Sequence, residues 1–219
     1  MDPEADRPAF ADAEPAAAVA VAISRLSVAV RHHAWQGAAA VGLTPTQGQL
    51  ADLLARRRGA TLGELADALG IGAATASEAI GALVEKGLVE KSRRAGDGRR
   101  LALRLTERGE RVAGQCATWP GFLTEATAAL PAVDQRALLA LLVRLIHELQ
   151  ERGAIPAARW CATCRSFRPR IHDDASRPHH CAFFDAPLGD GAFRFDCPEH
   201  AAADPKVAAA AFGRFVSAP

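Results

Sequence analysis

The stretch TLGELADALGIGAATASEAIGALVEKGLVEKSRRAGDGRRLALRLT, residues 61–106, decides the fold of this chain. Thr61 and Glu64 have the spacing of a reciprocal capping box, which predicts the start of a short helix. Thr44 and Gln47 have the same spacing and predict the start of the helix before it. Gly70 leaves only a tight turn before a second helix, which is expected to end at Gly87, because a left-handed C-terminal cap favours glycine. Two helices across such a turn predict a helix-turn-helix, the unit that places its second helix in the major groove of DNA.

Beyond Gly87 the pattern changes from helical to alternating. Leucines at every second position from Leu101 to Leu105 predict a strand with one face on the core. Residues 88–93 would supply its hairpin partner, with the turn at residues 95–98. Between Lys86 and Arg111 there are nine Lys or Arg and four Asp or Glu, a formal charge of +5 in a chain that carries +1 in total. Positive charge is therefore concentrated on the hairpin, where the phosphates of DNA would be met.

The run LTPTQGQL, the helix-turn-helix, KGLVEKSRRAGDGRR and LTERGE together resemble the multiple-antibiotic-resistance regulator (MarR) family of winged-helix transcription factors, over roughly residues 13–152. The resemblance implies a dimer that binds double-stranded DNA and has a pocket for a small-molecule effector. In that family the aspartate of the wing holds the loop and the arginine reaches the minor groove, so these roles are expected of Asp97 and Arg99. The candidate DNA-contacting residues are Thr75, Ser77, Glu78, Arg93, Arg94, Asp97, Arg99 and Arg100.

The second helix of the helix-turn-helix is poor in basic residues, which departs from the family. It offers Thr75, Ser77 and Glu78 where the family often has Arg or Lys. Glu78 has the chemistry to accept a hydrogen bond from a cytosine amino group, but its charge would repel phosphate. We therefore expect the affinity for DNA to come mainly from the wing.

The predicted fold is mainly α with a small β-wing: a winged helix-turn-helix, a helical dimerisation domain and a loop-rich four-cysteine module. Residues 1–12 are expected to be a disordered N-terminus, residues 13–156 the winged helix and dimerisation helices, residues 157–204 the metal-binding module, and residues 205–219 a C-terminal tail.

The predicted helix from Pro131 to Arg152 has more apolar surface than one domain of this size needs, which indicates a homodimer. A twofold dimer would set two recognition helices on successive major grooves, about 34 Å apart, and so predicts a pseudo-palindromic operator.

We expect neither a secretory signal nor a membrane span from this sequence. The first twelve residues are acidic and carry prolines, without a cationic start or a long apolar core. The longest apolar runs, residues 16–23 and 137–143, are far shorter than the roughly 18 residues of a membrane span. We expect a cytoplasmic protein with no membrane partner.

Four of the five cysteines cluster beyond the predicted dimerisation helix. Cys161 and Cys164 form a C-x2-C pair, and Cys181 and Cys197 follow at intervals of 16 and 15 residues that are rich in proline and glycine. In a cytosolic protein such clustering indicates metal ligands before disulfides. The spread of single cysteines and the proline after Cys197 favour an iron–sulfur cluster, while structural zinc and a metal-free thiol pair remain alternatives.

Three histidines near the last two cysteines, His179, His180 and His200, are candidate replacement ligands or hydrogen-bond donors to the ligands. The leading hypothesis is a regulator whose metal module senses redox state or iron. The alternative is a structural zinc module that binds a protein partner, with regulation by a small molecule. A thiol oxidoreductase using the C-x2-C pair is a remote third reading, because the alternating strand and helix pattern that carries such a motif is missing, and no enzymatic activity is expected.

Overall fold

The computed structural model describes residues 14–94 and 97–217, a mainly helical chain with two small antiparallel sheets. Its elements, in chain order, are α1 (Pro15–Ala40), α2 (Pro45–Arg56), α3 (Leu62–Leu69), α4 (Ala73–Glu85), β1 (Val89–Arg94), β2 (Asp97–Leu105), α5 (Glu107–Cys116), α6 (Gly121–Ala128), α7 (Ala132–Glu151), the 3-10 turn η1 (Cys161–Thr163), β3 (Phe167–Arg168), β4 (His179–Cys181), β5 (Ala186–Leu188), the 3-10 turn η2 (Asp190–Ala192) and α8 (Pro205–Val216). The predicted disordered N-terminus, residues 1–12, lies outside the described residues.

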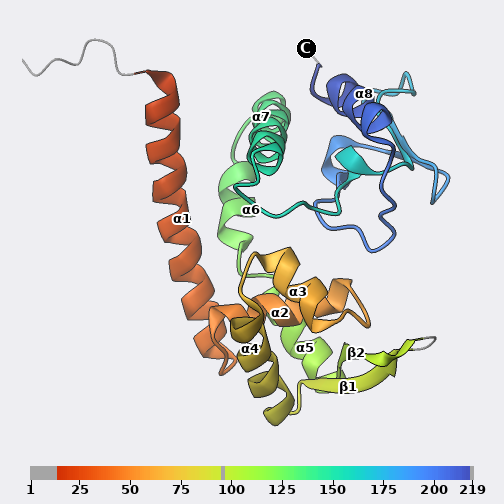
Figure 1. Ribbon diagram of the computed structural model, residues 1–219. Coiled ribbons are helices and arrows are strands. Elements are labelled where there is room, and N and C mark those ends of the chain that lie inside the picture. The colour runs from red at the N-terminus through yellow and green to blue at the C-terminus, as the bar shows by residue number, and fades with distance from the viewer. Residues whose placement is uncertain (1–13, 95–96, 218–219) are drawn as a thin grey trace, which may run out of the picture.

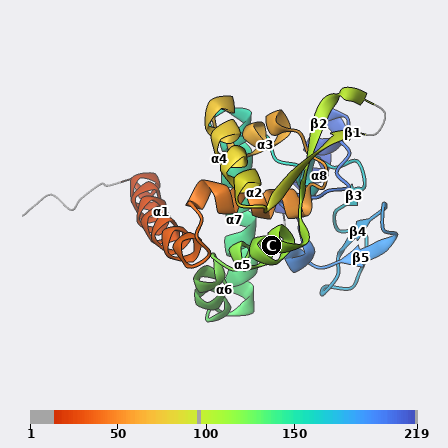
Figure 2. The same cartoon turned by 90° about the horizontal axis from the view of Figure 1, so that it is seen from below.

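Helix α4 and the β1–β2 hairpin lie at one end of the molecule, and α7, α8 and the cysteine module lie at the other (Figure 1). In the view from below, which looks at the end that carries α4 and the hairpin, these two elements lie on either side of α2, and α5 lies beside the base of the hairpin (Figure 2). The long helix α1 runs along one edge and stands apart from the cysteine module in both views. Helix α4 and the hairpin therefore lie at the opposite end of the molecule from α7 and α8.

Both helices that lead into the helix-turn-helix begin with the capping boxes that the sequence predicts. Thr44 and Gln47 cap α2 reciprocally, and Thr61 and Glu64 do the same for α3. Gly70 ends α3 in a left-handed conformation with φ of 62°, and Gly87 follows α4 with φ of 66°. The buried face of these helices forms one core with the start of the hairpin, whose main members are Leu50, Leu54, Leu65, Ile80, Leu83, Leu88 and Leu103.

The hairpin differs from its prediction on one face. Leu103 is buried and its backbone N–H donates to the carbonyl of Ala60, but Leu101 is 55% exposed and Ala102 is buried instead. The prediction that every second leucine of β2 faces the core is therefore wrong at Leu101. Leu103 is held against the helical domain by its bond to Ala60, whereas Leu101 pairs with Arg93 beside a break in register, further out on the wing. Strand β2 also begins at Asp97, inside the predicted turn, while Ala95 and Gly96 lie outside the described residues.

The motif LTERGE joins the hairpin to α5 through backbone contacts. Thr106 caps α5 by accepting the N–H of Gly109, and its hydroxyl donates to the carbonyl of Gly87. A Cβ built on Gly109 would overlap the backbone carbonyl oxygen of Leu88, so only glycine lets α5 approach the first strand this closely. Pro120 is the N-cap of α6 and lies between α5 and α6.

The C-terminal module has a second core of its own, made with α7 and α8. Trp160, Phe167 and Phe215 are buried there together with Val143 of α7. Strands β3, β4 and β5 form a small antiparallel sheet in that order. The expected tail at residues 205–219 contains helix α8 instead, because an apolar stripe ending in Ala211, Phe215 and Val216 finds this aromatic core to pack on.

Within the described ranges 14–94 and 97–217, no single helix is long and apolar enough to cross a membrane. Only α3 and α4 taken together, across their bend of 116°, reach the required length and composition.

Candidate functional sites: a winged helix and a four-cysteine cavity

The second helix of the helix-turn-helix exposes the three residues expected to face DNA. Thr75, Ser77 and Glu78 are all exposed on α4, while Ala76 and Ala79 between them face the core. Small buried residues thus let α4 lie close to its own domain and present one polar face outward. The helix remains without an exposed Lys or Arg along Ala73–Glu85.

The five wing candidates are placed only through their backbones. Arg93 and Arg94 end β1, and Asp97, Arg99 and Arg100 lie in β2. Their side chains lie outside the described part of the structure, so the roles expected of Asp97 and Arg99 stay predictions.

Some of the basic residues counted around the hairpin are committed to internal contacts. The Nζ of Lys86 donates to the carbonyl of Gly42 at 2.7 Å and to Oε1 of Gln47 at 2.9 Å, which ties the end of α4 to the start of α2. Arg108 donates to the backbone carbonyl of Lys86, and Arg111 pairs with Glu107 at 2.6 Å. The charge available to phosphate is therefore concentrated in the strands rather than at their two ends.

All four clustered cysteines line one cavity of about 270 Å³, although three separate stretches of chain supply them. Cys161 begins η1 and Cys164 follows it, Cys181 ends β4, and Cys197 follows η2. The rest of the lining is largely apolar and includes Phe167, Phe183, Phe184, Leu188 and Phe193. The structure thus brings together the four residues that the sequence predicts as metal ligands.

Backbone hydrogen bonds hold each cysteine segment in place around the cavity. The N–H of Cys161 donates to the carbonyl of Arg194, and the N–H of Arg194 donates to Sγ of Cys161 at 3.3 Å. Cys164 bridges Ala202 as an isolated antiparallel pair. Cys181 pairs with Phe167 on one side and Ala186 on the other, in the central strand of the sheet.

All five cysteines are free thiols, and the environment of one ligand candidate opposes its ionisation. Burial raises the pKa of the Cys161 thiol to about 11, although the hydrogen bond from the N–H of Arg194 acts to lower that pKa. The C-x2-C pair starts only a three-residue 3-10 turn, whereas a redox-active C-x2-C motif is typical of a longer strand and helix unit. These surroundings do not favour the thiol oxidoreductase hypothesis.

None of the three nearby histidines lines the cavity. His179 is buried and has both ring nitrogens engaged: Nδ1 accepts from the N–H of Arg170, and Nε2 lies 2.8 Å from Oδ1 of Asp190. His180 contacts His172, and His200 contacts the hydroxyl of Thr163. The histidines therefore make hydrogen bonds that hold the segments around the cysteines in place. In this arrangement the cysteines, and not the histidines, are placed to bind a metal in the cavity.

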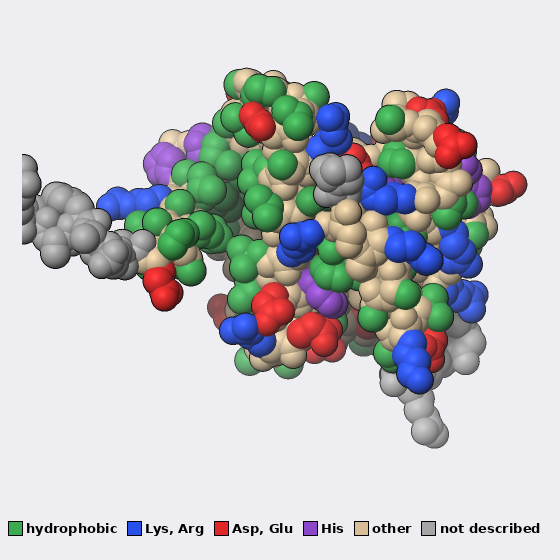
Figure 3. Space-filling view, turned by 90° about the horizontal axis from the view of Figure 1, so that it is seen from above, with side chains coloured by type: hydrophobic (Ala, Val, Ile, Leu, Met, Phe, Trp, Pro, Cys, Tyr) green, Lys and Arg blue, Asp and Glu red, His purple; other side chains and the backbone are tan. Residues whose placement is uncertain are grey.

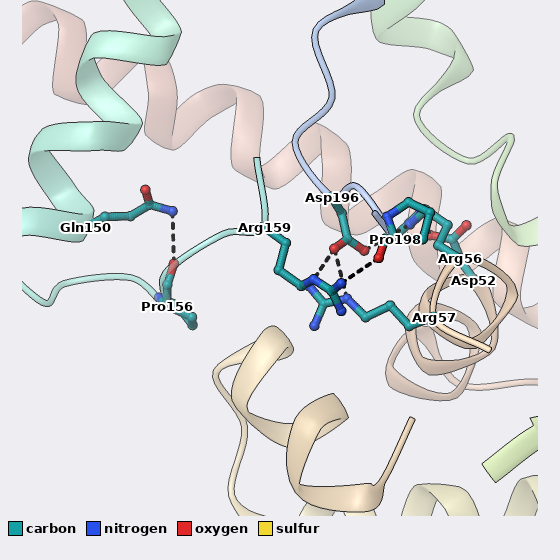
Figure 4. A network of polar contacts seen from close by, with 8 residues as sticks. All are labelled: Asp52, Arg56, Arg57, Gln150, Pro156, Arg159, Asp196 and Pro198. Atoms are coloured by element: carbon teal, nitrogen blue, oxygen red, sulfur yellow. Dashed lines mark hydrogen bonds and ion pairs between the residues drawn. The ribbon is translucent and has the colours of Figure 1, made fainter. Parts of the chain in front are cut away.

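One acidic residue joins the cysteine module to the DNA-binding domain. Asp196, next to Cys197, accepts hydrogen bonds from Arg57 at 2.5 and 2.8 Å and pairs with Arg56 at 3.4 Å, at the C-terminal end of α2 (Figure 4). The side chains of Arg57 and Asp196 are 12% and 17% exposed, so this ion pair is largely shielded from solvent. On the module side, Arg159 donates to the carbonyl of Pro198 and its own carbonyl accepts the N–H of Cys197.

A cleft of about 1570 Å³ lies beside this contact. It is bounded by α2, α3 and their connection on one side and by the module on the other, and its lining includes Arg58, Gly70, Pro156, Arg159, Arg194 and Glu199. The sequence offered no signal for this cleft, because its walls are far apart along the chain.

Known proteins resemble the part of the chain that contains the first of these two sites. The family model described as MarR family matches residues 41–100. Among curated proteins, none matches the chain.

Several solved structures share the fold. The chain is 21% identical to Staphylococcus aureus MepR in its complex with DNA, with a TM-score of 0.53 over 60% of this chain and 97% of that one. For a MarR protein from Peptoclostridium difficile the identity is 19% and the TM-score 0.56, over 67% and 94% of the two chains. For the transcriptional regulator SlyA the identity is 20% and the TM-score 0.55, over 61% and 95%. These likenesses confirm the predicted winged-helix fold.

Proposed function

We propose, from the match of residues 41–100 to the model of the MarR family, that the protein is a transcriptional regulator of this type that binds double-stranded DNA as a homodimer. The observation that carries the proposal is the exposed polar face of α4 beside a basic hairpin, at one end of the molecule. The complex of S. aureus MepR with DNA supports it, since that protein shares the fold. The recognition helix would lie in a major groove, with the wing on the adjoining phosphates.

The unpartnered apolar surface of two helices supports the dimer. On α1, Val19, Val21 and Leu26 are more than half exposed, and on α7 Val133 and Leu141 are about 60% exposed. In the space-filling view from above, apolar side chains gather along α1 and on the neighbouring column of helices (Figure 3). Large exposed apolar patches of this kind are typical of protein interfaces. A second copy would cover them and set two recognition helices on a pseudo-palindromic operator.

Binding is tested with duplexes selected from a random pool by the full-length protein, followed by fluorescence anisotropy over a range of salt concentrations. Replacing Arg99 and Arg100 together by Ala should weaken binding and lower the magnitude of the slope of log K against log salt by up to about two, because two positive charges that displace counterions from DNA are lost. Arg152→Ala is the matched control, since Arg152 pairs with Glu148 at the far end of α7. Failure to enrich any duplex, or equal salt slopes in all three proteins, would refute the proposal.

We further propose that the cysteine module is a metal centre whose state alters DNA binding. The support is its contact with the DNA-binding domain: Cys197 is adjacent to Asp196, which pairs with Arg57 at the end of α2. A change in the position of the Cys197 segment would therefore act on a helix that packs against both α4 and α5. Replacing Cys161 and Cys164 by Ser should change the affinity for the selected duplex, whereas unchanged affinity in a folded variant would reduce the module to a passive support.

The alternative keeps the DNA-binding dimer but makes the module a structural zinc unit for a protein partner, with regulation by a small molecule. The arginine-lined cleft beside Asp196 supports an effector with anionic groups. A colourless protein with one zinc per chain and full DNA binding would favour this alternative.

A further inference from the structure

The four clustered cysteines line one cavity of about 270 Å³, which has room for more than one metal ion. Among the described His, Cys, Asp and Glu side chains, no group of three or more has the arrangement that holds a single metal ion.

Zinc–sulfur bonds are about 2.3 Å long, so the four sulfurs of a tetrahedral zinc site stand roughly 3.8 Å apart, closer together than the ligands of a cluster with several irons. Cys181 is fixed in the central strand of a three-stranded sheet, and Cys161 is held by its reciprocal hydrogen bonds with Arg194. The fold therefore fixes the backbones of two of the four cysteines.

The lining has the chemistry that a thiolate-bound cluster needs. Phe167, Phe193 and Leu188 exclude water from the cavity, and Phe183 and Phe184 extend it toward the surface. The N–H of Arg194 already donates to Sγ of Cys161, and hydrogen bonds to ligand sulfurs together with burial set the reduction potential of such clusters. No histidine or aspartate lines the cavity, so the described lining supplies thiolates as its ligands, with Glu199 as the one carboxylate.

We propose that Cys161, Cys164, Cys181 and Cys197 ligate one iron–sulfur cluster that fills this cavity, and not a single metal ion. Each thiol releases its proton to solvent as its bond to iron forms. The proposal deepens the metal centre proposed above and does not depend on DNA binding. It also favours the sensing role over a structural zinc unit, because an iron–sulfur cluster responds to iron supply and to oxidants.

The test uses full-length protein purified without oxygen, and apoprotein supplied with ferrous iron and sulfide or with zinc alone. We expect about two to four irons per chain with an equal amount of acid-labile sulfide, a broad visible absorbance, and an electron paramagnetic resonance signal after one-electron reduction or oxidation. Cys161→Ser and Cys197→Ser should each lower the iron content and the absorbance. Cys116→Ala, which alters a buried thiol that does not line the cavity, should leave both unchanged.

One zinc or one iron per chain without sulfide would overturn the inference, as would a cluster that survives loss of both Cys161 and Cys197. The metal, sulfide and spectroscopic measurements on the unmodified protein decide the question even if a serine variant fails to fold. Binding to the selected duplex is measured on the same preparations. A cluster without DNA binding would refute only the regulator, and DNA binding without a cluster would refute only this inference.

Discussion

At the scale of single residues, the contact between Asp196 and Arg57 is the most consequential polar interaction in the described structure. It joins residues 139 positions apart, and both side chains are largely shielded from solvent. Removing the carboxylate of Asp196 would leave the shielded guanidinium of Arg57 without this partner. The loss of this ion pair is therefore expected to destabilise the protein more than the loss of an ion pair on the surface.

We expect Asp196→Asn to destabilise the contact between the module and α2 by about 1–2 kcal/mol, with the unpaired charge of Arg57 as the physical cause. Hydrogen–deuterium exchange should show faster exchange at the end of α2. Asp174→Asn is the control, because Asp174 contacts only Ser176 and Arg177 within the module. Equal exchange in the two variants would mean that the ion pair does not hold the two parts together.

The thiol of Cys116 should be unreactive in the folded protein. Burial, with a smaller contribution from the negative charge of Asp52, raises its pKa to about 11 from an ordinary value of 9.0. Because the thiolate is the nucleophile, the reactive fraction at pH 8 is about 100-fold below that of an unperturbed thiol, and it grows as the pH rises toward the raised pKa. Alkylation mapped by mass spectrometry should be slow at Cys116 in the native state and fast in denaturant. Rapid native modification at pH 8 would contradict the assignment of Cys116 as a buried packing residue.

At the scale of elements, the joint between the hairpin and α5 explains the glycine in LTERGE. Helix α5 is capped by Thr106 and lies against the backbone of Leu88 at Gly109, so its position sets the base of the wing. The same helix carries Gly114, which is exposed and has open space around its Cα. The two glycines therefore separate the effect of close packing from the effect of helix propensity.

Gly109→Ala is expected to lower the free energy of unfolding by about 1–3 kcal/mol, because the added methyl group overlaps the carbonyl of Leu88. Gly114→Ala should raise it by up to about 1 kcal/mol, because alanine favours the helix and meets no neighbour. Urea unfolding followed by circular dichroism measures both. A stabilising Gly109→Ala would show that α5 can move away from β1 without loss.

At the scale of the whole molecule, α1 and α7 expose more apolar surface than either the winged helix or the module covers. A second copy is the occupant proposed for this surface, and the spacing of two recognition helices depends on it. The free edge of α1 in Figure 1 is consistent with a helix that has its partner on another chain.

Replacing Val21 and Leu141 by Glu should convert the protein to a monomer and weaken its binding to the selected duplex, because both residues are about 60% exposed on the proposed interface. Sedimentation velocity measures the mass of the particle. Val207→Glu is the matched control, since Val207 is 52% exposed on α8, which does not belong to the proposed interface. If the doubly substituted protein remains a dimer, the interface lies elsewhere.

The sequence by itself determined the winged helix-turn-helix, its two capping boxes, the glycine that ends α4 and the identity of the four clustered cysteines. These features are encoded within a few residues, in helical period, cap spacing and motif, so they need no knowledge of the chain's path. Only the tertiary structure decided that the cysteines surround one cavity and that Asp196 reaches Arg57. It also decided that α8 forms in the expected tail at residues 205–219 and that Leu101 is exposed. Each of these depends on segments that are distant along the chain, and the energy of such contacts comes from how the segments pack against one another, which no local pattern records.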